Sequence, residues 1–264
     1  MMTMRILVTN DDGIDSPGLH ALAAMAVRLG HDVVVAAPAR EASGSGSSLT
    51  GVEADGRIAT ETRASMFAGV PTFAVSASPA FIALMATRGA YGPEPDVILS
   101  GINRGPNTGA AVLHSGTVGA AFTAAANGCR AMAVSLDIPF SSRSEEGAVE
   151  HWDTAAEVAG DLLPLLNADF VLNVNVPNLH AGDLRGIRRA SLAQFGTVQM
   201  VLLEQGHGYV RMSLEQSDHG AEPGSDDAWL LDGYVAVTPV RPPHEARDVV
   251  LPGLVDTAGE HVGG

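Results

Sequence analysis

The chain has 264 residues, with 15 basic and 30 acidic side chains and a formal net charge of -15 at pH 7. Every basic residue is arginine, which excludes a P-loop lysine, a Schiff-base lysine and a polybasic membrane anchor. The acidic balance argues against binding to a nucleic acid polymer, because few cations are present to displace the counterions of its phosphates. The single cysteine, Cys129, cannot form an internal disulfide, and we expect a cytoplasmic protein. Because the apolar runs are short or broken by Pro, Gly and polar residues, we expect no membrane segment.

The first two thirds of the chain alternates short apolar runs with Ala- and Leu-rich stretches. Strands are predicted at 5–9, 32–37, 72–76, 96–100, 131–136 and 170–176, and helices at 17–30, 79–88, 115–127 and 148–166. Continuous apolar strands separated by helices are typical of a parallel sheet covered on both faces. We therefore predict an α/β fold, a Rossmann-like three-layer sandwich with a mostly parallel sheet.

The final third of the chain has a different pattern. Residues 187–214 alternate polar and apolar side chains between Gly-rich breaks, which predicts extended antiparallel strands. An acidic, exposed loop is expected at 218–227, in which Asp226 and Asp227 form a solvated face or the start of a helix, and a last strand is expected at 234–238. We interpret residues 1–264 as one domain, with a core of about 1–185 and a β-rich extension and tail of about 186–264.

Three polar loops follow three of the predicted strands at their carboxyl ends. They are Asn10-Asp11-Asp12-Gly13, residues 38–50 and residues 100–107. In an open parallel sheet, ligands bind in the crevice beyond the carboxyl ends of the strands. We therefore expect these loops to converge on one site although they are far apart in the sequence.

Asp11 and Asp12 are adjacent carboxylates at the end of an apolar strand. Two neighbouring anions repel each other unless a cation lies beside them, and a chain without lysine makes a metal ion the first candidate. Oxygen ligands favour Mg²⁺ or Mn²⁺, and no Cys/His cluster indicates zinc. The alternative is a solvated turn in which one aspartate caps the helix that follows.

Two further segments are candidates for binding an anion. The small residues of 44–48 would let backbone N–H groups approach a phosphate, but the same composition is typical of a flexible surface loop. Ser115 stands at the start of a predicted helix, where free N–H groups attract phosphate, or where it simply caps the helix. The preceding His114 is by itself more typical of a structural or surface histidine than of a catalyst.

Together these segments resemble the SurE family of survival proteins, which are metal-dependent nucleotide phosphatases. The matching pieces follow the family order across about 235 residues; they are ILVTNDDGIDSPGL (6–19), VVVAAPAREASGSGSSLT (33–50), SGINRGPNTG (100–109), SGTVGAA (115–121), LNVNVPN (172–178) and DGYVAVTP (232–239). The combination of NDDG with SGIN-x-G-x-N is the most specific part of the resemblance.

The resemblance implies roles for individual residues. One divalent metal ion, Mg²⁺ or Mn²⁺, would be held by Asp11, Asp12, Ser43 and Asn103. The phosphate would be held by Asn107, Ser115, Gly116 and Thr117, with Asn107 contacting the phosphate or the attacking water. The extension would exchange elements between subunits of a homodimer or homotetramer.

The implied activity is that of a 5'/3'-nucleotidase, which hydrolyses nucleoside monophosphates by in-line attack of a metal-activated water. Asp11, Asp12 and Asn107 would be catalytic, with Asp12 the favoured proton acceptor and His114 a candidate acid for the leaving group.

The chain departs from the family pattern at three places. His114 stands where an aromatic residue is common, Thr123 stands where an acidic residue is common, and 206–210 replaces a stretch that is commonly rich in Arg and Tyr. These departures leave open a sugar phosphate or the phosphate of a specialised metabolite as the substrate, and also an inactive nucleotide-binding protein. A haloacid-dehalogenase-type phosphatase is disfavoured, because the chain lacks the Asp-x-Asp opening and the later lysine of that mechanism.

Overall fold

The structure, a computed structural model, describes residues 3–51, 53–138, 149–194, 198–216 and 221–245. The strands of its main sheet are β1 (Arg5–Thr9), β2 (Asp32–Pro38), β5 (Thr60–Thr62), β6 (Thr72–Val75), β7 (Val97–Arg104), β8 (Arg130–Asp137), β9 (Val171–Pro177), β10 (Ile187–Arg189) and β13 (Val235–Val240). Their order is β10-β13-β9-β8-β7-β1-β2-β6-β5. From β9 to β6 neighbouring strands are parallel, while β13 and β5 join this block in antiparallel orientation.

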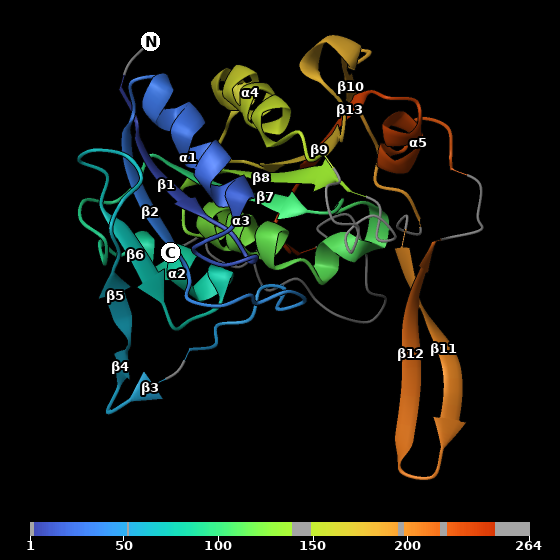
Figure 1. Cartoon of the computed structure of the whole chain (residues 1–264), viewed down its shortest axis with the longest axis horizontal. Helices are drawn as coiled ribbons and strands as arrows, with labels where there is room; N and C mark the ends of the chain where they lie inside the picture. The colour runs from blue at the N-terminus through green and yellow to red at the C-terminus, as the bar shows by residue number, and fades with distance from the viewer. Residues whose placement is uncertain (1–2, 52, 139–148, 195–197, 217–220, 246–264) are drawn as a thin grey trace, which may run out of the picture.

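Helices cover both faces of the sheet, as Figure 1 shows. Helices α1 (Pro17–Arg28) and α4 (Trp152–Leu162) pack on one face, and α2 (Pro79–Ala86) and α3 (Gly116–Ala126) pack on the other. The apolar side chains that alternate along β1 and β7 contribute to two separate cores, with Val8 and Leu99 on the α1 face and Leu7 and Ile98 on the α3 face. This three-layer arrangement confirms the predicted α/β fold.

Two predicted elements of the core have different bounds in the structure. Strand β7 continues through Arg104 instead of ending at Ser100, because Asn103 and Arg104 remain paired with β8. The helix predicted at 148–166 is α4 followed by the 3-10 helix η3 (Leu163–Leu165), and residue 148 lies outside the described residues. Pro164 lacks the N–H that an α-helix would need at this point.

The final third combines additions to the sheet with a projecting hairpin. Strands β11 (Val198–Gly206) and β12 (Tyr209–Gln216) form an antiparallel pair that extends away from the body of the molecule in Figure 1, which confirms the prediction of antiparallel strands there. The prediction was wrong for β10, which pairs in parallel with β13 in the main sheet. Among the remaining elements are the short strands β3 (Glu53–Ala54) and β4 (Arg57–Ile58), the 3-10 helices η1 (Gly109–Leu113) and η4 (Ala181–Asp183), and α5 (Asp226–Leu231).

The acidic segment before β13 also differs from its prediction. Asp226 and Asp227 begin α5, which agrees with the helix start that the sequence offered as an alternative, but they are buried, whereas an exposed acidic segment was expected. Residues 218–220 of that predicted loop lie outside the described residues, as do residues 246–264 of the tail. Within the described ranges, no helix combines the length and the apolar composition that crossing a bilayer requires.

Candidate functional site at the carboxyl edge of the sheet

The turn after β1 is fixed by Asn10. Its side-chain Nδ2 donates to the Gly13 carbonyl at 3.0 Å and to Ser16 Oγ at 2.6 Å, and its Oδ1 accepts the Gly13 N–H at 3.2 Å. Ser16 in turn caps α1 by accepting the Leu19 N–H. The N-cap of α1 is therefore Ser16 and neither aspartate of the turn, so both carboxylates can make contacts outside this helix.

Asp11 is tied to the start of α3. The side chain is 4% exposed, and its two oxygens accept hydrogen bonds from the Thr117 hydroxyl at 2.6 Å and the Thr117 N–H at 3.1 Å. Burial raises the pKa of the Asp11 carboxyl above its ordinary value, while the hydrogen bonds from Thr117 oppose that shift. A carboxylate thus lies at the N-terminus of α3, the end of a helix that attracts negative charge.

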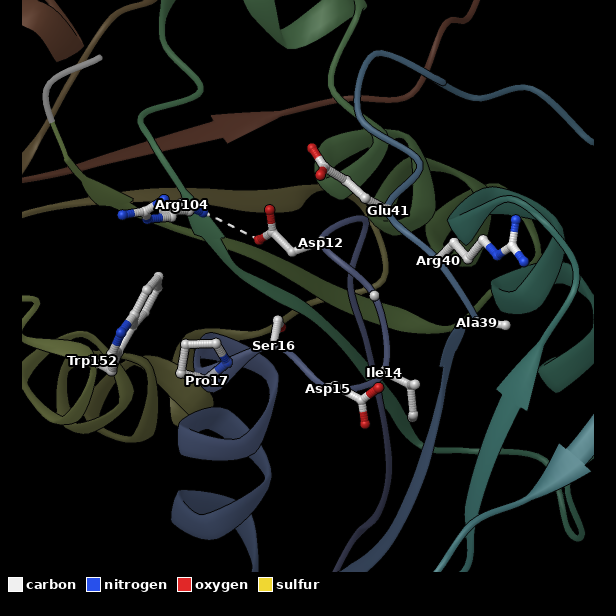
Figure 2. A pocket seen from close by; sticks show the side chains of 11 residues that line it. Asp12, Ile14, Asp15, Ser16, Pro17, Ala39, Arg40, Glu41, Arg104 and Trp152 are labelled. Atoms are coloured by element: carbon white, nitrogen blue, oxygen red, sulfur yellow. Dashed lines mark hydrogen bonds between the residues drawn. The ribbon is translucent and has the colours of Figure 1, made fainter. Parts of the chain in front are cut away.

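Asp12 is hydrogen-bonded to the end of β7. Its Oδ2 accepts the backbone N–H of Arg104 at 3.2 Å, an interaction drawn in Figure 2, and the side chain is half-buried. Arg104 is also held by Glu150, with 2.6 Å between its Nε and the carboxylate oxygen. A cavity of about 420 Å³ borders Asp12, with Pro17, Arg104 and Trp152 among its lining residues.

The glycine-rich segment after β2 packs against the first turns of α3. A Cβ atom on Gly116 would lie 2.7 Å from Ser45 Oγ and 2.8 Å from Asp11 Oδ2, and one on Gly119 would lie 2.2 Å from the Gly46 carbonyl oxygen. These contacts are closer than real side chains allow, so any larger residue at either helix position would have to displace its neighbours. Residues 44–48 therefore have a packing role in addition to the binding role considered from the sequence.

Ser43, on the same loop, is exposed, and its hydroxyl donates to Glu41 at 2.6 Å. Its neighbour Ala42 donates a backbone N–H to the Asp11 carbonyl at 2.7 Å. The loop that carries Ser43 is thereby joined directly to the acidic turn, so the loops after β1 and β2 converge as the sequence predicts.

Asn107 is held from several directions by buried polar groups of the sheet. Its Nδ2 donates to Ser135 Oγ at 2.8 Å, and its backbone N–H donates to Asn175 Oδ1 at 2.7 Å. Its carbonyl accepts from Asn173 Nδ2 at 2.8 Å and from Asn175 Nδ2 at 3.1 Å. Asn103 pairs with Ser135 in the register of β7 and β8, so both predicted asparagines border this serine.

Three of the four residues expected to hold phosphate stand together at the start of α3. Ser115 is the N-cap, and its Oγ accepts the Val118 N–H at 3.1 Å. Thr117 donates both its hydroxyl and its N–H to Asp11. Gly116 lies between the Ser115 N-cap and Thr117. His114 is exposed and donates its backbone N–H to Ala111, while its carbonyl accepts the Gly46 N–H at 3.2 Å.

Comparison with known proteins bears on this arrangement. The profile of the family described as "Survival protein SurE" matches residues 6–198. The protein "5'/3'-nucleotidase SurE" of Escherichia coli O127:H6 is 34% identical over 258 residues, covering 94% of this chain and 95% of that protein, and its namesake in Shigella dysenteriae serotype 1 gives the same values. The chain belongs to the SurE family.

A solved structure of another SurE protein is similar throughout. The crystal structure of SurE from Aquifex aeolicus superposes with a TM-score of 0.73 at 30% sequence identity, covering 92% of this chain and 96% of that one. The agreement therefore extends well beyond the segments that carry the motifs.

The oxygen donors of this SurE chain fit a hard divalent cation. In the described part of the chain, no three His, Cys, Asp or Glu side chains form a group that could hold a metal ion, so the two aspartates would need neutral oxygen partners. Ser43 offers such an oxygen on the loop after β2, and Asn103 offers one near the end of β7. A carboxylate has about four acceptor positions, so Asp11 can bind a cation while it accepts from Thr117.

The sequence did not identify the buried residues that fix the site residues in place by hydrogen bonds. Asn173 and Asn175 alternate with buried valines in β9, and both are themselves fully buried. That alternation of polar and apolar residues was visible in the segment LNVNV, because side chains two apart on a strand share one face. Ser135, Arg104 and Asp226 carried no comparable signal.

Proposed function

We propose that this chain is a metal-dependent phosphomonoesterase that hydrolyses nucleoside monophosphates, as a 5'/3'-nucleotidase. The observation that carries the proposal is the placement of the Asp11-Asp12 pair against the N-terminus of α3 and beside the loop of Asn107. The names of its relatives, which are 5'/3'-nucleotidases, support the choice of nucleotides over other phosphomonoesters.

Asp11, Asp12, Ser43 and Asn103 would hold one Mg²⁺ or Mn²⁺ ion. When bound, such an ion neutralises charge on the phosphate and makes a water ligand more acidic. The need for it follows from charge, because two carboxylates in the crevice would otherwise repel an anionic substrate.

The residues of the chain divide the remaining tasks. Ser115, Gly116 and Thr117 would bind phosphate oxygens at the start of α3, where the helix dipole favours an anion, and Thr117 would exchange one of its two bonds to Asp11 for a bond to phosphate. Asn107 would stabilise the equatorial oxygens from a backbone that Asn173 and Asn175 already hold, while its side-chain amide donates to Ser135. Asp12, oriented by the Arg104 N–H, is our candidate to accept the proton of the attacking water.

His114 is the candidate acid for the leaving group. It is exposed and precedes Ser115 directly, so its side chain lies on a segment adjoining the proposed phosphate site. The variant His114→Ala should lower kcat more for substrates with a poor leaving group than for an aryl phosphate. An equal effect on both substrates would remove the proposed role.

The hairpin of β11 and β12 would mediate assembly into a homodimer or homotetramer. An isolated two-stranded hairpin is only marginally stable in water, and this one carries exposed apolar side chains. They are Leu202, Leu203, Tyr209, Val210 and Met212. The variant Leu202→Glu should reduce the molar mass measured by light scattering, whereas an unchanged mass would exclude this surface.

We place the protein in the cytoplasm. Cys129 is buried and free, and burial raises the pKa of its thiol to about 12. Such a thiol is a poor nucleophile and a poor disulfide partner, which is compatible with a structural role in a reducing compartment.

The test of the proposed function is phosphate release from a panel of substrates. Nucleoside 5'- and 3'-monophosphates, sugar phosphates and an aryl phosphate are compared at equal concentration with Mn²⁺, with Mg²⁺ and with chelator. Metal-dependent turnover that is strongest on nucleotides is expected. Turnover of sugar phosphates alone would keep the chemistry and change the substrate, and nucleotide binding without any turnover would indicate a binding protein.

A further inference from the structure

Asp226 is a fully buried carboxylate beneath the loop that follows Asn107. It is 0% exposed, and its Oδ2 accepts the Gly109 N–H at 2.9 Å across 117 positions of sequence. Its Oδ1 accepts the Ala193 N–H at 2.9 Å and the Asp227 N–H at 3.1 Å. One side chain thus joins three segments of backbone.

Capping of its own helix, α5, does not explain why Asp226 is buried. The N-cap of α5 is Ser225, whose Oγ accepts the Ala228 N–H at 3.2 Å. Two of the three bonds to the Asp226 carboxylate come from other segments, Gly109 and Ala193. Burying a carboxylate is costly unless hydrogen bonds compensate for the lost hydration, so these two contacts account for its presence inside the protein.

The two remote contacts lie at functionally different places. Gly109 begins η1, two residues after Asn107, and η1 leads directly to His114 and the start of α3. Ala193 lies shortly before β11, at the root of the projecting hairpin. From β9, Asn173 and Asn175 donate to the carbonyl of Asn107. Asp226 accepts the N–H of Gly109, two residues further along the chain.

We propose that Asp226 is a positioning residue, which sets the loop between Asn107 and α3 and connects it to the root of the hairpin. The inference rests on the proposed function, because it assigns the loop a role in phosphate binding. A displacement of about 1 Å in such a loop can cost up to roughly a hundredfold in rate. The proposed metal ligands lie outside the loop between Asn107 and α3, so metal binding should be spared.

The variant Asp226→Asn tests this role. Asparagine has the same shape but only one acceptor oxygen, so it cannot accept from both Gly109 and Ala193. Its kcat should fall at least about tenfold and inhibition by inorganic phosphate should weaken, while the Mn²⁺ affinity measured by calorimetry stays within about threefold of wild type. Asp232→Asn, at the exposed end of the same helix, is the matched control and should behave like wild type.

Amide hydrogen exchange supplies the structural measurement. In Asp226→Asn, exchange should become faster at residues 105–113 and 190–194 and remain unchanged in β1 and α1. Wild-type kinetics would overturn the proposal. So would a loss of Mn²⁺ affinity with faster exchange along the whole chain, since Asp226 would then serve only the stability of the fold.

A measurement on the wild-type protein decides the matter if the variant does not fold. Inorganic phosphate added with Mn²⁺ should slow exchange at 190–194 together with 105–113, and protection confined to the site loops would contradict the connection. This binding test needs no turnover. A wild-type protein that binds phosphate but releases none from any substrate would therefore overturn the proposed function and still test the role of Asp226.

Discussion

Gly116 provides the sharpest test of how the acidic turn is placed against α3. In Gly116→Ala, the new Cβ would lie 2.8 Å from Asp11 Oδ2 and 2.7 Å from Ser45 Oγ. Ordinary contact begins near 3.4 Å, so Asp11 must move by about 0.6 Å or the helix must move away. Asp11 is too buried to yield without disturbing the turn or Thr117.

The expected cost of Gly116→Ala follows from these distances. Overpacking a tight site destabilises a protein by about 1–3 kcal/mol, which should appear as a lower thermal midpoint. Misplacement by a large fraction of an ångström should lower kcat/KM by about ten- to a hundredfold. Phosphate release at saturating Mn²⁺ measures the second effect, and calorimetric titration shows how much of it reflects weaker metal binding.

Gly182→Ala is the matched control for this substitution. No heavy atom lies within 4 Å of the position that its Cβ would occupy, and it belongs to η4, remote in sequence from the loops of the site. It should retain wild-type activity and stability. If Gly116→Ala also stayed within twofold of wild type in kcat/KM with an unchanged thermal midpoint, the described contact between Asp11 and α3 would be refuted.

Three further outcomes follow from the same contacts. Thr117→Val removes the hydroxyl that donates to Asp11 and should lower stability by about 1.5–3 kcal/mol in thermal unfolding, whereas Thr117→Ser should retain most of it. Asn175→Ala removes the acceptor for the Asn107 N–H, so kcat should fall about tenfold while the Mn²⁺ affinity measured by calorimetry stays unchanged. If kcat and Mn²⁺ affinity fell together, the loop of Asn107 would not bind phosphate independently of the metal site. Chelation should abolish phosphate release and added Mn²⁺ should restore it, and full activity in chelator would exclude a metal mechanism.

The fold was predictable where local pattern and tertiary structure agree. The apolar runs of β1 and β2 and the start of α1 at Pro17 lie within a residue or two of their predicted positions. Strand β10 was not predictable, because three residues carry too little pattern to distinguish an added sheet strand from part of a hairpin. The polar strands β3 to β5 gave no signal for the same reason.

The site was predictable through its motifs and not through its supports. Asp11, Asp12 and Ser115 stand at element ends, where sequence identifies them and where the structure brings their segments together. Asp226 was expected to be solvated, because its acidic surroundings are typical of an exposed segment. Its burial depends on N–H groups of Gly109 and Ala193, which only the folded chain brings within reach.

The most direct test of the central claim compares two aspartates of one turn. Asp12→Asn removes the negative charge of a proposed metal ligand, whereas Asp15→Asn changes an exposed carboxylate three residues away. Mn²⁺ titration followed by phosphate release from a nucleoside monophosphate should find Asp15→Asn equal to wild type, and Asp12→Asn weakened in Mn²⁺ binding and nearly inactive. An Asp12→Asn protein that binds Mn²⁺ and releases phosphate like wild type would contradict the proposed metal site.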